Sequence, residues 1–127
     1  EKGLGAMHAM AHAVGARFKT HHGPTVGTIM PYVLRFNRRR IQGKMCEVAR
    51  FLDLPRHDYR GVLDWVLELR MELGIPGTLR KLGVREPDIP SLAERALQDA
   101  NAATNPVPLD LDGLTRVFRW AVRGKAG

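Results

Sequence analysis

Three histidines near the start of the chain have the side chains and the spacing that a metal site or a proton-transfer site needs. His8 and His12 are four residues apart, and a helix places such a pair on one face, with about 5–6 Å between the Cβ atoms. His22, which precedes Gly23, can approach the same space from a turn. A neutral imidazole is the commonest metal ligand and also exchanges protons near neutral pH. We expect His8, His12 and His22 to line one concavity.

Two alternatives for the histidine pair are weaker. The zinc-protease motif has the same spacing, but it needs a glutamate as general base directly after the first histidine, where this chain has Ala9. The pair Gly3 and Gly5 lacks the third glycine and the preceding strand of a dinucleotide-binding fingerprint, so these glycines are expected to allow a close approach to the backbone. His21 should face away from the concavity, because adjacent side chains diverge.

Apolar residues recur at helical intervals over nearly the whole chain, which predicts an all-α bundle of about six or seven helices. The buried stripes are expected within 41–52, 62–73, 92–100 and 114–121. The helix over 62–73 is expected to be central, with Trp65 in the core, and Trp120 is expected in the core as well. No segment alternates apolar and polar residues as a strand would.

Turn-forming and capping residues mark the expected ends of these helices. Gly74 and Pro76 should end the helix over 62–73. Ser91 and Asp110 are predicted N-caps of the two helices that follow. Pro31 interrupts a strongly apolar stretch and predicts either a kink or a helix that restarts there.

Composition narrows the class of protein. A chain of 127 residues fits one domain, and it begins at Glu1 within an expected helix, as a piece of a longer protein would. The single cysteine, Cys46, excludes a disulfide framework and fits a reducing, cytoplasmic location. No apolar run is long enough to span a membrane. The net charge is +7, but the run Arg38–Arg40 has no interleaved aromatic residues, so we interpret it as a solvated surface and expect no nucleic-acid partner.

The histidine segment also resembles a known family. Residues 3–15 read Gly-Leu-Gly-x-x-His-x-x-Ala-His-x-x-Gly, and His22-Gly23 and Met30-Pro31-Tyr32-Val33 with Asn37 follow. This pattern resembles the iron-containing (group III) alcohol dehydrogenases. The segments 73–76, 82–84 and Asn105-Pro106 look like that family too. The resemblance covers almost the whole chain and implies that residues 1–127 are the C-terminal helical metal-binding domain of a two-domain, dehydroquinate-synthase-like enzyme.

The resemblance implies a role for each histidine. The family holds one divalent metal, usually iron, on an aspartate and three histidines, and His8 and His22 are similar to two of these ligands. His12 matches the histidine that lies beside the nicotinamide, which makes it a candidate catalytic and cofactor-binding residue. The maleylacetate reductase branch, which works without metal, has Lys and Cys where this chain has Ala9 and Ala11, so the metal-using branch is favoured.

The resemblance also implies partners that this chain does not contain. The other two ligands and the glycine-rich N-terminal nucleotide-binding domain of the same polypeptide would precede Glu1. The expected cofactors are Fe²⁺, with Zn²⁺ as an alternative, and NAD or NADP. The expected substrate is a small alcohol or aldehyde, and a homo-oligomer is compatible with this assignment. The 127 residues alone are expected to be inactive.

Three interpretations of function therefore stand. The first is the metal-binding catalytic half of an NAD(P)-dependent alcohol dehydrogenase, which oxidises an alcohol to an aldehyde or ketone by hydride transfer. The second is a basic helical module that binds nucleic acid or protein without catalysis. The third is a helical domain that keeps the fold but not the site.

Overall fold

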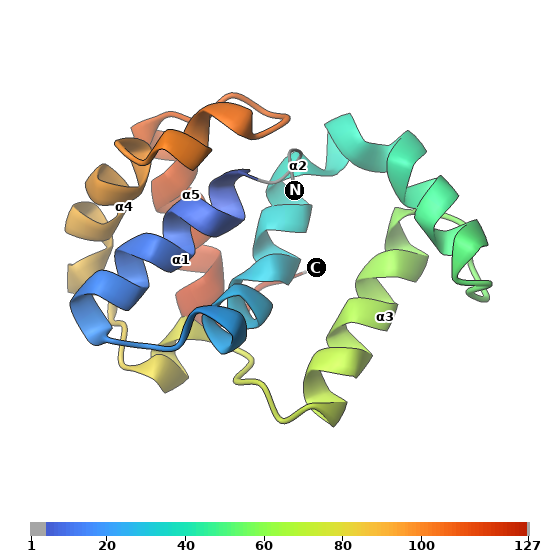
Figure 1. The fold of residues 1–127 in the computed structure, drawn as a ribbon, viewed down its shortest axis with the longest axis horizontal. Helices are drawn as coiled ribbons and strands as arrows, with labels where there is room; N and C mark the ends of the chain where they lie inside the picture. The colour runs from blue at the N-terminus through green and yellow to red at the C-terminus, as the bar shows by residue number, and fades with distance from the viewer. Residues whose placement is uncertain (1–4, 127) are drawn as a thin grey trace.

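A computed structural model describes residues 5–126 and shows a helical protein in that range, with no strand (Figure 1). The all-α prediction is confirmed. The described residues hold five α-helices and three short 3₁₀ helices, where about six or seven helices are predicted, because the apolar stretch around Pro31 and the stripe within 41–52 form one long helix. The elements are α1 (Gly5–Phe18), α2 (His22–Phe51), α3 (Tyr59–Glu72), η1 (Leu79–Leu82), η2 (Glu86–Asp88), α4 (Ile89–Leu97), η3 (Ala100–Thr104) and α5 (Leu111–Arg123), where η denotes a 3₁₀ helix.

The buried apolar side chains form two core clusters. The first joins α1 and the N-terminal part of α2 to α4, α5 and η1, and the second joins the C-terminal part of α2 to α3. Met30 of α2 packs against both clusters. Figure 1 shows this division, with α1, α4 and α5 gathered on one side of α2 and α3 on the other.

The predicted stripe of α2 is confirmed, whereas the prediction for α3 is wrong in part. Ile41, Met45 and Ala49 are buried between α2 and α3. Trp65, however, is 36% exposed and Leu73 is 64% exposed, so α3 is a peripheral helix. Among the described helices, α3 packs chiefly on α2. Helix α3 carries apolar residues on two flanks, and α2 covers only one of them.

Two of the predicted helix ends are confirmed, and a third is corrected. Asp110 accepts a hydrogen bond from the Gly113 amide at 2.7 Å and caps α5 as predicted. Gly74, which follows α3, has a φ of 72°. This left-handed backbone conformation is typical of a glycine just past the end of a helix, where Gly74 is predicted to lie. Ser91 is not an N-cap, because α4 begins two residues earlier, with Pro90 in its first turn.

Helix α2 runs through Pro31 without a break, so of the two alternatives predicted there, a kink or a restart, the restart is wrong. Proline removes one backbone donor and crowds the preceding turn. The neighbouring Ile29, Tyr32 and Val33 are nonetheless buried in the first core cluster, and this packing holds the helix together across the proline. Figure 1 shows that α2 changes direction along its length, so that its C-terminal part extends away from α1 and beside α3.

Two buried asparagines fix the start of α1. The Asn105 Nδ2 donates to Asn37 Oδ1 at 2.7 Å, and the Asn37 Nδ2 donates back to Asn105 Oδ1 at 3.0 Å. Asn105 Oδ1 also accepts the Ala6 amide at 3.3 Å, and the Val107 amide donates to Asn37 Oδ1 at 3.1 Å. The two amides therefore tie α2 and the segment after η3 to the first turn of α1, directly before His8.

Gly5 brings the same end of α1 against η3. A Cβ atom at Gly5 would lie 1.8 Å from the Asn101 carbonyl oxygen, where no side chain fits. The expectation that a glycine here permits another segment to approach the backbone closely is thus confirmed for Gly5. Gly3 lies outside the described residues.

Within the described part of the chain, no helix is both long enough and apolar enough to cross a lipid bilayer.

Candidate functional site

The structure brings His8, His12 and His22 together. The ring centroids of His8 and His22 are 5.8 Å apart, with ring planes at 11°. Those of His12 and His22 are 5.6 Å apart, with planes at 34°. His8 is half-buried, and His12 and His22 are exposed. The three histidines are thus close together, while the predicted concavity and their separate roles stay predictions.

Two helices supply these side chains from different directions. His8 and His12 lie on α1, where the adjacent Ala9 and Ala11 are buried in the first core cluster. His22 is the first residue of α2 and follows a short turn in which Lys19 has a φ of 56°. The Thr25 hydroxyl donates to the His21 carbonyl oxygen at 2.6 Å and so fixes the first turn of α2. This local structure holds His22 against α1.

The other two histidines lie apart from this group. His21 is exposed and precedes α2 without capping it through its side chain. No ring contact between His21 and the three clustered histidines is present in residues 5–126. His57 is exposed in the connection before α3, as expected of a surface residue.

Asp99 joins the site, although no motif in the sequence links it to the histidines. Its Oδ2 lies 2.8 Å from Nδ1 of His12. Its Oδ1 accepts the Asn101 amide at 2.8 Å and the Asn101 side-chain amide at 3.0 Å, so both carboxylate oxygens are engaged. Burial raises the pKa of Asp99, but the hydrogen bonds from Asn101 and His12 outweigh this effect and lower the pKa below its ordinary value.

The Asp99 contact determines which nitrogen of His12 is available. An ionised carboxylate can only accept hydrogen bonds, so Nδ1 of His12 must carry a proton in this contact. In a neutral ring, Nε2 is then the nitrogen that can accept a proton. Asp99 and the adjacent η3 therefore fix the orientation and the tautomer of His12 from outside α1.

The histidine group can contribute part of a metal site. A metal ion lies about 2 Å from each coordinating imidazole nitrogen, so two rings with centroids 5.8 Å apart can share one ion. No set of three or more His, Cys, Asp or Glu side chains in residues 5–126 is arranged to hold an ion. Ring separation does not distinguish His8 from His12 as the partner of His22. A carboxylate partner such as Asp99 occurs on both ligand and proton-transferring histidines.

Comparison with known proteins identifies the family of this chain. The model for the C-terminal part of the Fe-containing alcohol dehydrogenase family matches residues 1–122. Lactaldehyde reductase of Escherichia coli (strain K12) is 33% identical over 125 residues, covering 94% of this chain and 33% of that protein. The 1,3-propanediol dehydrogenase of Klebsiella pneumoniae is 34% identical over 127 residues, covering 93% of this chain and 32% of that protein.

Solved structures agree with this assignment. A 1,3-propanediol oxidoreductase superposes with a TM-score of 0.84 at 31% identity, covering 91% of this chain and 32% of that one. The iron-containing alcohol dehydrogenase of Thermococcus thioreducens gives a TM-score of 0.83 at 27% identity, covering 94% and 32%. This chain spans about one third of the length of the relatives it matches. The histidine segment and the helical fold thus lead to one conclusion: the chain belongs to the iron-containing alcohol dehydrogenase family and matches its C-terminal part.

Proposed function

We propose that this chain is the metal-binding part of an NAD(P)-dependent alcohol dehydrogenase that converts a small alcohol to an aldehyde or ketone by hydride transfer. The observation that carries the proposal is the convergence of His8, His12 and His22 in a member of this family. Relatives named for lactaldehyde, 1,3-propanediol and butanol support a short-chain substrate. A cytoplasmic location fits the free thiol of Cys46.

In this proposal His8 and His22 are two ligands of one divalent metal, Fe²⁺ or Zn²⁺. Two imidazoles at this separation suit either ion, and an aspartate and a further histidine from upstream of Glu1 would complete the set. When bound, such a metal polarises the substrate oxygen and lowers the pKa of the alcohol. The N-terminal nucleotide-binding domain of the same polypeptide would hold the cofactor, so residues 1–127 alone are not expected to catalyse the reaction.

His12 is the proposed contact to the nicotinamide and the proposed proton carrier. Its Nδ1 is held by Asp99 at 2.8 Å, which leaves Nε2 to accept the proton that the alcohol loses. Asp99 does not itself meet the substrate in this scheme. It is a positioning residue that keeps one tautomer and one ring orientation of His12.

Replacing His12 by alanine in the complete enzyme tests this division of roles. We expect bound metal to stay nearly unchanged and kcat to fall about 100-fold or more, the usual contribution of general acid–base catalysis. Metal content is measured by elemental analysis, and turnover is measured by the absorbance of the reduced cofactor. A variant that loses its metal would show that His12 is a ligand.

The change Asp99→Asn tests the positioning role. Asparagine keeps a side-chain oxygen for the Asn101 amide, but it cannot hold His12 as an ionised carboxylate does. We expect kcat to fall about 10- to 100-fold while KM for the alcohol and metal content change little. The control is Asp88→Asn, which removes the carboxylate paired with Arg17 at the start of α4. Equal effects of the two variants on kcat would contradict the assignment.

A further inference from the structure

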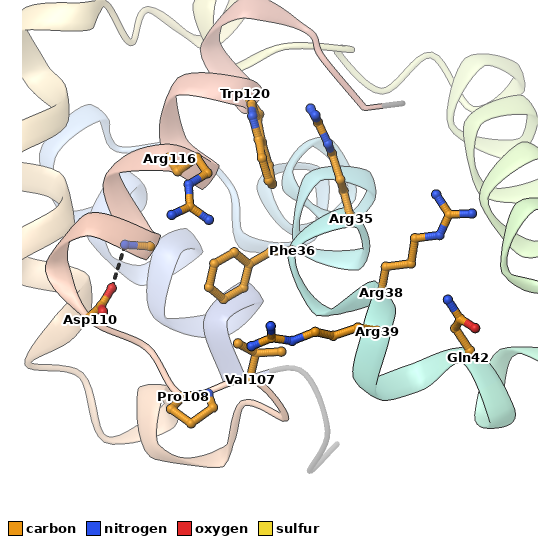
Figure 2. Close-up of a pocket in the computed structure, with 11 residues that line it drawn as sticks. Arg35, Phe36, Arg38, Arg39, Gln42, Val107, Pro108, Asp110, Arg116 and Trp120 are labelled. Atoms are coloured by element: carbon orange, nitrogen blue, oxygen red, sulfur yellow. Dashed lines mark hydrogen bonds between the residues drawn. The ribbon is translucent and has the colours of Figure 1, made fainter.

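Four arginines line a cleft between the middle of α2 and the N-terminal part of α5 (Figure 2). Arg35, Arg38 and Arg39 come from α2, and Arg116 comes from α5. The cleft is open to solvent and has a volume of about 550 Å³. None of its lining residues belongs to the histidine group.

The positive charge of this cleft is only partly balanced by carboxylates within the described residues: Asp110 lies in the lining, and Arg38 is close enough to Asp58 to help lower the pKa of that carboxyl. The ion pairs of residues 5–126 use other arginines and none of these four. Asp110 is the acidic residue in the lining; its carboxylate accepts the Gly113 amide at 2.7 Å and keeps its negative charge, so the arginines of the lining outnumber its acidic residue. Several like charges close together repel one another, and a bound anion would relieve that repulsion.

Two of the guanidinium groups are held in place by aromatic rings. Arg35 lies 3.9 Å from the centroid of the Trp120 ring and donates to the Lys125 carbonyl oxygen at 2.9 Å. Arg38 lies 4.7 Å from the centroid of the Tyr59 ring. A stacked guanidinium keeps N–H groups at its edge for an oxyanion and loses less conformational freedom when it binds one. Trp120 is half-buried and forms part of the cleft wall. The prediction that it is a core residue is therefore wrong in part.

We propose that this cleft binds the diphosphate group of a small molecule. Guanidinium groups bind phosphate oxygens through paired hydrogen bonds, and several of them suit a ligand with more than one negative charge. Arg38, Arg39 and Arg40 are all exposed, as their interpretation as a solvated surface predicts, and Arg38 and Arg39 also line the cleft. Figure 2 shows Arg39 and Arg116 on opposite sides of Phe36, and all three residues line the cleft.

The test uses the complete protein and a probe that reports each arginine separately. Phenylglyoxal modifies exposed guanidinium groups, and mass spectrometry of the peptides gives the rate at each position with and without inorganic pyrophosphate, at constant ionic strength. At about ten times the dissociation constant, pyrophosphate should slow modification of Arg39 and Arg116 about tenfold. Arg40 and Arg119, exposed on the same two helices but outside the cleft, should react at unchanged rates. A diphosphate site elsewhere in the protein does not affect this comparison.

Two double variants with equal charge loss sharpen the test. In Arg39→Gln/Arg116→Gln, the dissociation constant for pyrophosphate, obtained from protection of Arg35, should rise about tenfold or more, because hydrogen bonds to charged groups are lost. In Arg40→Gln/Arg119→Gln it should stay the same, and the unfolding temperature of both variants should match that of the parent. Equal weakening in both variants would overturn the proposal, as would the absence of protection in the parent protein.

Other anions complete the experiment. Weaker protection by inorganic phosphate than by pyrophosphate supports a diphosphate ligand. Equal protection by sulfate or phosphate at the same ionic strength would overturn that specificity. Protection of Arg39, Arg40, Arg116 and Arg119 alike by a single-stranded oligothymidylate would overturn the proposal in favour of a general polyanion surface.

Discussion

Replacing His22 by alanine in the complete protein is expected to remove the bound metal and, with it, metal-dependent turnover. His22 is the one member of the histidine group that α2 provides, with its ring centroid 5.8 Å from that of His8. A ligand set that loses one of its imidazoles holds the ion much less tightly. Because a bound metal supplies several kcal/mol of transition-state stabilisation, we expect kcat to fall about 1,000-fold or more.

The adjacent histidine provides a matched control for this experiment. His21 is exposed, has the same side chain and precedes α2 directly, but it lies outside the ring contacts of the group. The variant His21→Ala should keep its metal, measured by elemental analysis, and its turnover. If His21→Ala lost the metal and His22→Ala kept it, His21 and not His22 would be the metal ligand.

The second large effect is expected on stability, from Asn105→Leu. Leucine has a similar size but cannot replace the hydrogen bonds of Asn105 to Asn37, to the Ala6 amide and to the Val107 carbonyl oxygen. Each buried polar group left without a partner costs about 1–3 kcal/mol. The free energy of unfolding, measured by urea denaturation, should therefore fall by about 3 kcal/mol or more. This is a large share of the roughly 5–15 kcal/mol that stabilises a typical domain.

A double-variant cycle separates this network from a general effect of leucine. Asn37→Leu should be destabilising for the same reason, because its amide pairs reciprocally with Asn105. In the double variant neither asparagine leaves its partner unpaired, so the loss should be smaller than the sum of the two single losses. Strict additivity of the two losses would show that the reciprocal pair does not act as a unit.

The features of this protein that repeat along the chain could be predicted from its sequence. The helical spacing of apolar residues identified an all-α fold, and the four-residue spacing of His8 and His12 placed both on one side of α1. Both predictions depend on neighbours within two turns of a helix, where geometry is nearly fixed. The placement of His22 beside them followed from the short turn between α1 and α2.

Contacts between distant segments could not be found in this way. Asp99 lies 87 residues after His12, and its local signal is that of a turn or helix-capping residue before Asn101. The arginine cleft likewise needs α5 to pack beside α2, which no local spacing encodes. The exposure of Trp65 was missed because an apolar stripe shows which face a helix can bury but not how many partners cover it.

The division of the core into two clusters separates the histidines from most of α3. All three clustered histidines lie on α1 and at the start of α2, and Ala102, close behind Asp99, packs on the first core cluster. Helix α3 belongs to the second cluster and meets the rest of the described chain mainly through α2. Substitutions on the outer face of α3, around Trp65 and Leu69, therefore reach the histidines only indirectly. Polar substitutions on that face are expected to leave the arrangement of the histidines unchanged.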